Sequence, residues 1–262
     1  MTDLVAAAHG TADPRGIRAV HSLVRIIARL RPEVPVSLGF VDVDTPALPS
    51  LMTRVVADSN RAVVVPLLLS SGYHVAVDVL GEATRRPDQV AAAEALGPDP
   101  VLAEILADRL AASLRPDGDV RGVDRVVLAA AGSSDRRALL DCSAVAASLA
   151  ALVNRPVEVG YVSGAGERLG AVLERTPGRV AVATYLLAPG FFADRIATVA
   201  ARAGATASAP LGPDPRLATL ALRRFDEAVA RRWAADPSEP ACACPGTRRA
   251  RELARSKIVG GH

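Results

Sequence analysis

Short apolar runs alternate with longer amphipathic stretches along the chain. Near-continuous runs of Val, Leu and Ala are typical of strands covered on both faces, and they occupy residues 3–8, 35–42, 62–69, 90–94, 125–130, 157–162, 180–187 and 204–208. Apolar residues repeated at helical spacing predict helices over residues 15–31, 46–59, 136–153, 166–175, 193–202 and 214–233. Pro14 and Pro46 stand where the first turns of two of these helices would begin. The alternation predicts an α/β fold built on parallel sheets with helices on both faces.

The same succession of segments occurs twice. The stretch LVAAAHGTAD at 4–13 returns as VVLAAAGSSD at 126–135, and LGPDPVLAEILADRL at 96–110 returns as LGPDPRLATLALRRF at 211–225. The distance between the copies is far longer than the repeat unit of a solenoid, which indicates duplication of a whole domain.

Two tandem duplicated domains are therefore expected, each with its own parallel sheet and with a cleft between them. They would cover residues 1–117 and 118–235, joined by the polar Pro/Gly stretch at 115–122, with a flexible basic tail at 236–262. The internal pairing of two copies predicts a monomer that is a pseudo-dimer.

Composition narrows the classes of function. Half of the residues are hydrophobic but only 3% are aromatic, so few rings could stack on nucleic-acid bases. The formal charge is +3, and a large part of the surplus is local to the basic stretch at 248–257. Three cysteines without regular spacing do not make a disulfide framework, and we see neither a signal peptide nor a membrane-spanning run. We expect a cytoplasmic protein without nucleic-acid or membrane partners.

Polar side chains gather where the predicted strands of the first copy end. Ligands of open parallel sheets bind beyond the carboxyl ends of the strands. The strand ends offer His9, Thr11, Asp42, Asp44, Ser70, Ser71, Tyr73, His74 and Asp78. Two imidazoles and a carboxylate with open positions would suit a transient divalent metal.

Each of these residues also has a purely structural interpretation. A histidine at a strand end can be a hydrogen-bonded loop residue, Asp42 can cap the following helix, and Gly10 and Gly72 can serve sharp turns. The pair Cys242 and Cys244 falls short of a four-ligand metal set.

The second copy serves as an internal control for the histidines. There Ala131 stands at the position of His9, Phe192 at that of His74, and Ser163 or a neighbour at that of Asp42. The glycines of both turns are kept. Because the duplicated scaffold does without the imidazoles, we interpret the histidines of the first copy as functional.

Three segments together resemble the sirohydrochlorin chelatases, a family of class II chelatases. They are LVAAAHGTADPRG, VSLGFVDVDTPALPSLM and VVVPLLLSSGYHVAVDV, and the resemblance extends over about residues 3–235. It implies a chelatase-like fold in its long two-copy form and insertion of a divalent metal into sirohydrochlorin, in siroheme or cobalamin biosynthesis. The metal would be a substrate: Fe²⁺ is favoured over Co²⁺, and Ni²⁺ is a further candidate. No organic cofactor is expected. The family often has Glu at the position of Asp42, which leaves the part of this shorter carboxylate open.

The resemblance implies roles for individual residues. His9 and His74 would be the metal ligands, and one imidazole or Asp42 would accept protons. The residues expected to bind the tetrapyrrole are Thr11, Arg15, Ser70, Ser71, Gly72, Tyr73, Phe191 and Phe192, with Arg18, Arg85 and Arg86 as further partners for its carboxylates. A non-catalytic metal or tetrapyrrole carrier with the same fold is the alternative. A phosphotransfer enzyme with a nucleophilic histidine is disfavoured because residue 8 is Ala rather than Arg.

Overall fold

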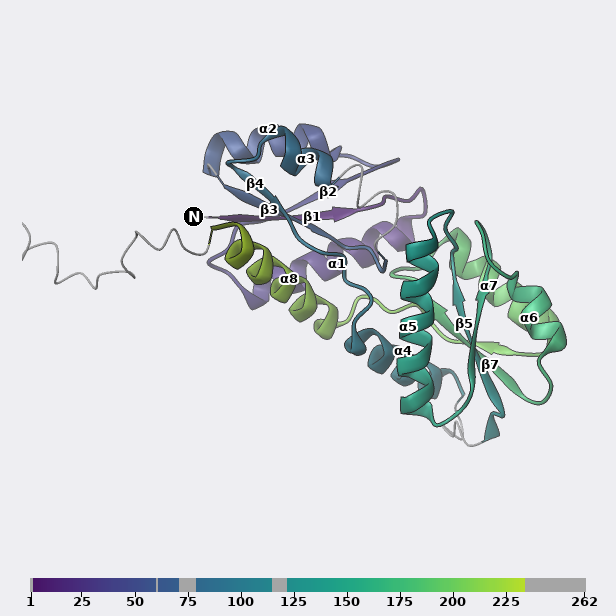
Figure 1. Ribbon diagram of the computed structural model, residues 1–262. Helices are drawn as coiled ribbons and strands as arrows, with labels where there is room; N and C mark the ends of the chain where they lie inside the picture. The colour runs from purple at the N-terminus through teal and green to yellow at the C-terminus, as the bar shows by residue number, and fades with distance from the viewer. Residues whose placement is uncertain (1, 60, 71–78, 115–121, 234–262) are drawn as a thin grey trace, which may run out of the picture.

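The computed structural model describes residues 2–59, 61–70, 79–114 and 122–233, which form two lobes (Figure 1). Each lobe contains a four-stranded parallel sheet, with strand order β2-β1-β3-β4 in the first and β6-β5-β7-β8 in the second. The strands of the first sheet are β1 (Asp3–Ala8), β2 (Val36–Phe40), β3 (Ala62–Pro66) and β4 (Val90–Ala92). Those of the second sheet are β5 (Arg125–Ala130), β6 (Val157–Tyr161), β7 (Val180–Tyr185) and β8 (Thr206–Ala207). The prediction of two parallel sheets in a duplicated α/β fold is confirmed.

The registers of the two sheets correspond residue by residue. Ala8 lies opposite Phe40 at the end of β1, as Ala130 lies opposite Tyr161 at the end of β5. After their first residues, Asp3 and Arg125, the central strands are wholly buried runs of Ala, Val and Leu, so helices can pack closely on both faces of each sheet.

The last helix of each copy packs on the sheet of the other copy. The helices are α1 (Pro14–Leu30), α2 (Leu48–Ser59), α3 (Leu80–Arg85), α4 (Pro100–Ser113), α5 (Arg136–Val153), α6 (Leu169–Arg175), α7 (Phe191–Arg202) and α8 (Pro215–Trp233). Helix α4 packs on α5 and β7 of the second lobe, and α8 packs on α1 and β3 of the first (Figure 1). In space, therefore, the first lobe contains α1, α2, α3 and α8, and the second contains α4, α5, α6 and α7.

This exchange produces one hydrophobic core that runs through both lobes. The inner faces of the two sheets, with α1, α4, α5 and α8, belong to one continuous cluster of buried residues. Two smaller clusters lie on the outer faces, under α2 in the first lobe and under α6 and α7 in the second. The lobes are thus joined by apolar packing as well as by the chain itself.

Several boundaries differ from the sequence prediction. Strand β3 ends at Pro66, and residues 67–69 continue beyond the sheet. Pro46 precedes α2 rather than opening it, and its carbonyl accepts the backbone N–H of Phe40. Helices α3 and α4 were not among the predicted elements, although the repeat partner of α4 was. Most of the linker at 115–122 and the whole of the tail at 236–262 lie outside the described residues.

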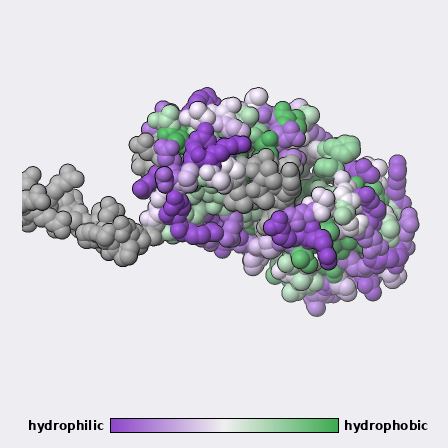
Figure 2. All heavy atoms as spheres, turned by 45° about the horizontal axis from the view of Figure 1, so that its top comes forward, coloured by the Kyte–Doolittle hydropathy of each residue, from purple (hydrophilic) through white to green (hydrophobic). Residues whose placement is uncertain are grey.

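Figure 2 shows hydrophobic side chains as scattered patches among charged and polar ones on the face in view. Of the helices that the structure describes, none combines the length and the hydropathy needed to cross a membrane.

Candidate active site

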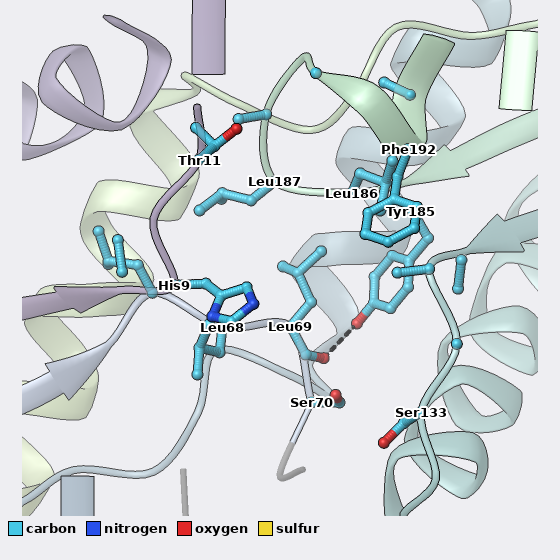
Figure 3. Close-up of a pocket in the computed structure, with 18 of the residues that line it drawn as sticks. His9, Thr11, Leu68, Leu69, Ser70, Ser133, Tyr185, Leu186, Leu187 and Phe192 are labelled. Atoms are coloured by element: carbon cyan, nitrogen blue, oxygen red, sulfur yellow. Dashed lines mark hydrogen bonds between the residues drawn. The ribbon is translucent and has the colours of Figure 1, made fainter. Parts of the chain in front are cut away.

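A cavity of about 790 Å³ lies between the lobes. Its walls are the segments that follow the carboxyl ends of β1 and β3 on one side, and of β5 and β7 on the other (Figure 3). The lining residues are mainly apolar, and among the described ones that line it His9 is the single imidazole. The cleft predicted between the two copies therefore exists. It lies beyond the carboxyl ends of the strands, where ligands of parallel sheets bind.

His9 stands at the tip of a tight turn at the first-lobe rim, by which we mean residues 9–11 and 67–70. Its ring points into the cavity (Figure 3), and its carbonyl accepts the N–H of Asp42 at 3.0 Å. Gly10 follows with a φ of +96°, and a Cβ there would lie 2.0 Å from the Asp42 carbonyl oxygen. Only glycine fits both the left-handed backbone and this close approach.

The turn is held further by Asp44 and Thr11. The Asp44 carboxylate accepts the N–H of Thr11 at 2.8 Å, and the Thr11 hydroxyl accepts the N–H of Asp13 at 3.1 Å. The sequence did not single out Asp44 for this supporting contact. Asp42 lies exposed behind the turn, with its carboxylate accepting the N–H of Val43.

The second lobe builds the same turn without a histidine. Gly132 has a φ of +100°, and a Cβ there would lie 1.9 Å from the Ser163 carbonyl oxygen. Ser133 accepts the N–H of Asp135, as Thr11 accepts that of Asp13. This geometry pairs Asp42 with Ser163 and His9 with Ala131, so the backbone path does not require an imidazole.

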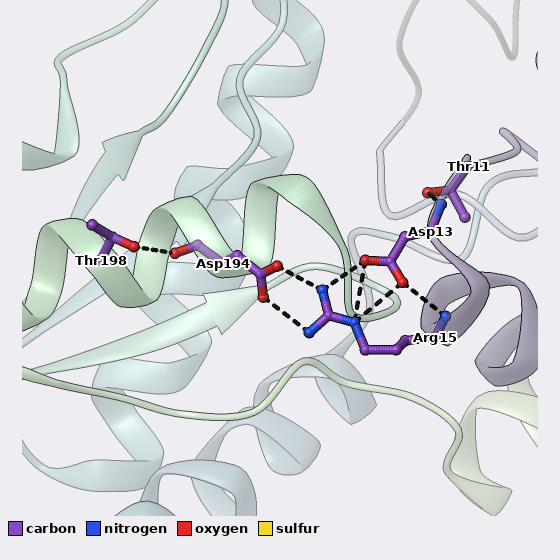
Figure 4. Close-up of polar contacts among 5 residues, drawn as sticks. All are labelled: Thr11, Asp13, Arg15, Asp194 and Thr198. Atoms are coloured by element: carbon purple, nitrogen blue, oxygen red, sulfur yellow. Dashed lines mark hydrogen bonds and ion pairs between the residues drawn. The ribbon is translucent and has the colours of Figure 1, made fainter.

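An arginine at the start of α1 joins the two lobes. The Arg15 guanidinium lies 2.6 Å from Asp13 in its own lobe and 2.6 Å from Asp194 on α7 of the other lobe (Figure 4). The hydrogen bonds that the Asp13 carboxylate accepts from Arg15 lower the pKa of Asp13 to about 2. In the second lobe Arg137 makes the corresponding pair with Asp135 alone among the described residues.

Two phenylalanines open α7 on the far wall of the cavity. Phe191 and Phe192 are 68% and 38% exposed, and their rings pack edge to face with centroids 5.4 Å apart. Both line the cavity. Exposed rings at the mouth of an apolar cleft form a surface on which a flat ligand could pack.

On the side of the second lobe, the floor of the cavity contains a buried thiol and a phenol. Cys142 and Tyr161 take the places that Val20 and Phe40 have in the first lobe, and all four line the cavity. The Tyr161 hydroxyl and the Cys142 thiol are hydrogen-bonded to each other. Burial is the largest cause that raises the pKa of Cys142 to about 11 and that of Tyr161 to about 12, so both groups stay neutral at physiological pH.

A third phenol connects the second lobe to the first-lobe rim. The Tyr185 hydroxyl donates to the carbonyl oxygen of Leu69 at 2.7 Å (Figure 3). The sequence patterns did not single out Tyr185. The repeat nevertheless carried a signal, since the corresponding position of the first copy is Leu67.

The structure brings together part of the predicted site. His9, Thr11, Ser70, Phe191 and Phe192 line the cavity, whereas Asp42 and Arg15 lie outside its lining. Arg85 and Arg86 pair with the buried carboxylate of Glu82. Ser71, Gly72, Tyr73, His74 and Asp78 lie outside the described residues. Within the described ranges, no three His, Cys, Asp or Glu side chains cluster closely enough to hold a metal ion.

Comparison with known proteins gives one family and several structures. The model of the CbiX family matches residues 3–113 and again 125–228. No curated protein sequence matches the chain. SirB from Bacillus subtilis with Fe³⁺ is similar with a TM-score of 0.72 and 20% identity, over 88% of this chain and 96% of that one.

Two further structures share the fold. The sirohydrochlorin chelatase SirB from Bacillus subtilis subspecies spizizenii, in complex with cobalt, has a TM-score of 0.69 and 19% identity over 87% of this chain and 96% of its own. CbiX, described as the terminal enzyme for biosynthesis of siroheme in denitrifying bacteria, has a TM-score of 0.63 and 20% identity over 86% of this chain and 99% of its own. At these identities the structures establish the fold, and the two family matches establish the duplication.

Proposed function

Because the chain belongs to the CbiX family, we propose that it inserts a divalent metal into sirohydrochlorin, with Fe²⁺ preferred over Co²⁺ and Ni²⁺ as a further substrate. One observation carries the proposal for this chain. An imidazole, that of His9, faces a large apolar cleft between two lobes, while the same turn of the second lobe carries alanine. The cleft is of the size that small-molecule sites have.

The reaction exchanges two protons for one metal ion. The macrocycle loses the protons of two pyrrole N–H groups and gains a dipositive ion, so the enzyme must deliver the metal and provide acceptors for the protons. His9 would act as an exchangeable metal ligand, together with His74, which lies outside the described residues. An incomplete ligand set suits transfer, because a closed coordination sphere would retain the metal. A neutral imidazole would accept the protons; Asp42, the other candidate, lies outside the cavity lining.

The apolar walls would hold the macrocycle. Phe191 and Phe192 of the second lobe would contact one side of the ring system, with the first-lobe rim carrying His9 opposite. The second lobe thus serves as a wall and the first lobe supplies the reacting groups. In this proposal Thr11, Ser70, Ser71, Gly72 and Tyr73 contact the tetrapyrrole.

The carboxylates of the tetrapyrrole need partners outside the cavity lining. Among the described residues, the lining contains neither arginine nor lysine. Arg15 is engaged by Asp13 and Asp194, so a substrate carboxylate would compete with the 58% exposed side chain of Asp194 for it. We therefore place the carboxylate contacts at the edge of the cleft.

The test is anaerobic metallation of sirohydrochlorin with Fe²⁺, Co²⁺ and Ni²⁺, followed by absorbance at enzyme concentrations far below that of the tetrapyrrole. A chelatase is expected to turn over many equivalents of tetrapyrrole per chain at a steady rate. A carrier, the alternative function, would saturate at one equivalent per chain. Saturation at one equivalent with all three metals would overturn the proposed activity in favour of the carrier.

A further inference from the structure

One position at which the two copies differ lies where the chain leaves the third strand of each sheet. In the second lobe Tyr185 ends β7 opposite Ala130, while Leu67 follows the end of β3 in the first lobe. Both positions line the cavity. The second copy therefore has a phenol where the first has an aliphatic side chain, and only the phenol can make a directed contact.

The contact of that phenol crosses from one lobe to the other. The Tyr185 side chain is almost wholly buried, 3% exposed, and its hydroxyl donates to the Leu69 carbonyl oxygen at 2.7 Å. Leu69 and Ser70 both line the cavity on the wall of His9 (Figure 3). Burial raises the pKa of Tyr185 well above its usual value, so the hydroxyl keeps its proton and remains a donor.

A glycine at position 97 leaves room for this contact. A Cβ on Gly97, which precedes α4, would lie 2.2 Å from the Leu69 carbonyl oxygen and 2.7 Å from the Tyr185 hydroxyl. At the corresponding glycine of the second copy, Gly212, the nearest atom to a Cβ is the Leu187 carbonyl oxygen at 3.0 Å. The junction in the first copy is therefore the tighter one, and it contains three chain segments instead of two.

We propose that Tyr185 is a positioning residue for metal insertion, which fixes the Leu69–Ser70 part of the first-lobe rim at the cavity from the opposite lobe. This inference rests on the proposed function. The hydroxyl touches neither metal nor tetrapyrrole in this role. It sets where one wall of the cleft stands relative to His9, and small displacements of such walls are costly in catalysis.

Thr184, the preceding residue, offers a matched control. Its hydroxyl donates to the Ser208 carbonyl oxygen, also at 2.7 Å, and is also buried, but both partners belong to the second lobe. Thr184 does not line the cavity. Thr184→Val thus removes a buried hydroxyl-to-carbonyl bond of the same length without touching the rim of the first lobe.

The experiment compares Tyr185→Phe and Thr184→Val with the wild-type protein. The measurements are kcat and KM for sirohydrochlorin with Co²⁺, normalised to folded protein, and amide hydrogen exchange over residues 67–70. Tyr185→Phe is expected to lower kcat about tenfold or more with a smaller change in KM, and to speed exchange over 67–70. Thr184→Val is expected to keep the wild-type kcat even if its melting temperature falls as far.

The outcomes separate this inference from the function on which it rests. If wild-type protein turns over and Tyr185→Phe keeps its kcat, or if both variants lose kcat equally, the positioning role is wrong while the chelatase function stands. If the wild-type protein itself turns over no tetrapyrrole, the proposed function fails, and the positioning role fails with it. Should Tyr185→Phe not fold, Gly97→Ala crowds the same junction, and unchanged kcat in its folded fraction would overturn the proposal.

Discussion

The turns after β1 and β5 follow the same backbone path and carry different chemistry. Both place a glycine with positive φ against a carbonyl oxygen, of Asp42 in one lobe and of Ser163 in the other. Ahead of the glycine stands His9 in the first turn and Ala131 in the second. The comparison separates what the fold needs, which is the glycine, from what the fold tolerates, which is the imidazole. A tolerated polar group that faces a cavity is a candidate for function.

The largest effect on activity is expected from removing the imidazole by which the two turns differ. His9→Ala should lower the rate of sirohydrochlorin metallation at least about a hundredfold, because it removes a proposed metal ligand, while thermal unfolding stays unchanged, since Ala131 makes the same turn. His74→Ala should give a comparable loss. Adding Ala131→His to His9→Ala should not restore activity, because Phe192 stands where the second imidazole would be needed. Wild-type rates in both single variants would refute the metal site.

Both turns depend on a glycine with positive φ, and this glycine can be replaced in each lobe. Gly10→Ala and Gly132→Ala each force a Cβ to within 2.0 Å or less of a carbonyl oxygen on a left-handed backbone. Each should lower the free energy of unfolding by about 1–3 kcal/mol or more, as measured by urea denaturation. Clearly different losses for the two variants would show that the turns are not equivalent in energy.

A smaller effect is expected from the arginines that follow the turns. Arg15→Ala removes the link to Asp194 across the cleft, whereas Arg137→Ala removes only a contact within its own lobe among the described residues. We expect Arg15→Ala to raise KM for the tetrapyrrole about two- to fivefold, the size of one exposed ion pair, and the difference from wild type to shrink in high salt. Arg137→Ala should keep the wild-type KM. An equal rise in both variants would remove any special role of the cross-lobe pair.

The smallest effect concerns the floor of the cavity and appears only at alkaline pH. The pKa of the Cys142 thiol rises from 9.0 to about 11 on folding, so between these values the unfolded chain loses its proton first. The stabilisation is complete below pH 9 and is lost as the pH rises toward 11. Cys142→Val, which copies Val20 of the first lobe, should therefore flatten the fall in unfolding free energy between pH 9 and pH 11. An unchanged slope in urea titrations would show that the thiol does not titrate as described.

The sequence predicted the strands well because buried parallel strands are apolar throughout. The run at 125–130 and strand β5 coincide, and the two sheets follow from the duplication. Helix α4 was missed in the first copy because its apolar residues surround much of its circumference, so that it lacks a clear amphipathic period. Its surroundings explain this, since α4 is buried between α5 and β7 of the other lobe.

The site was only partly predictable, for a physical reason. Residues that follow strand ends, such as His9 and Ser70, can be read from the sequence because the parallel topology sends them to one edge. Tyr185 and Asp194 act across the cleft, and no local pattern reveals a partner in the other lobe. The cross-lobe bonds of Arg15 and Tyr185 follow from the packing of the two copies, which periodicity does not encode.

The exchange of α4 and α8 has a consequence for any attempt to divide the protein. Leu102, Ile105 and Leu106 of α4 are fully buried against the second lobe, so a polypeptide that stopped after the first copy would carry this apolar helix without a sheet to cover it. Its own sheet would at the same time lack α8. Such a half could become self-sufficient only by intertwining with a second half, each lending its last helix to the other. Because α4 and α8 each pack on the sheet of the other copy, each copy completes the fold of its neighbour, and neither lobe is a separable domain.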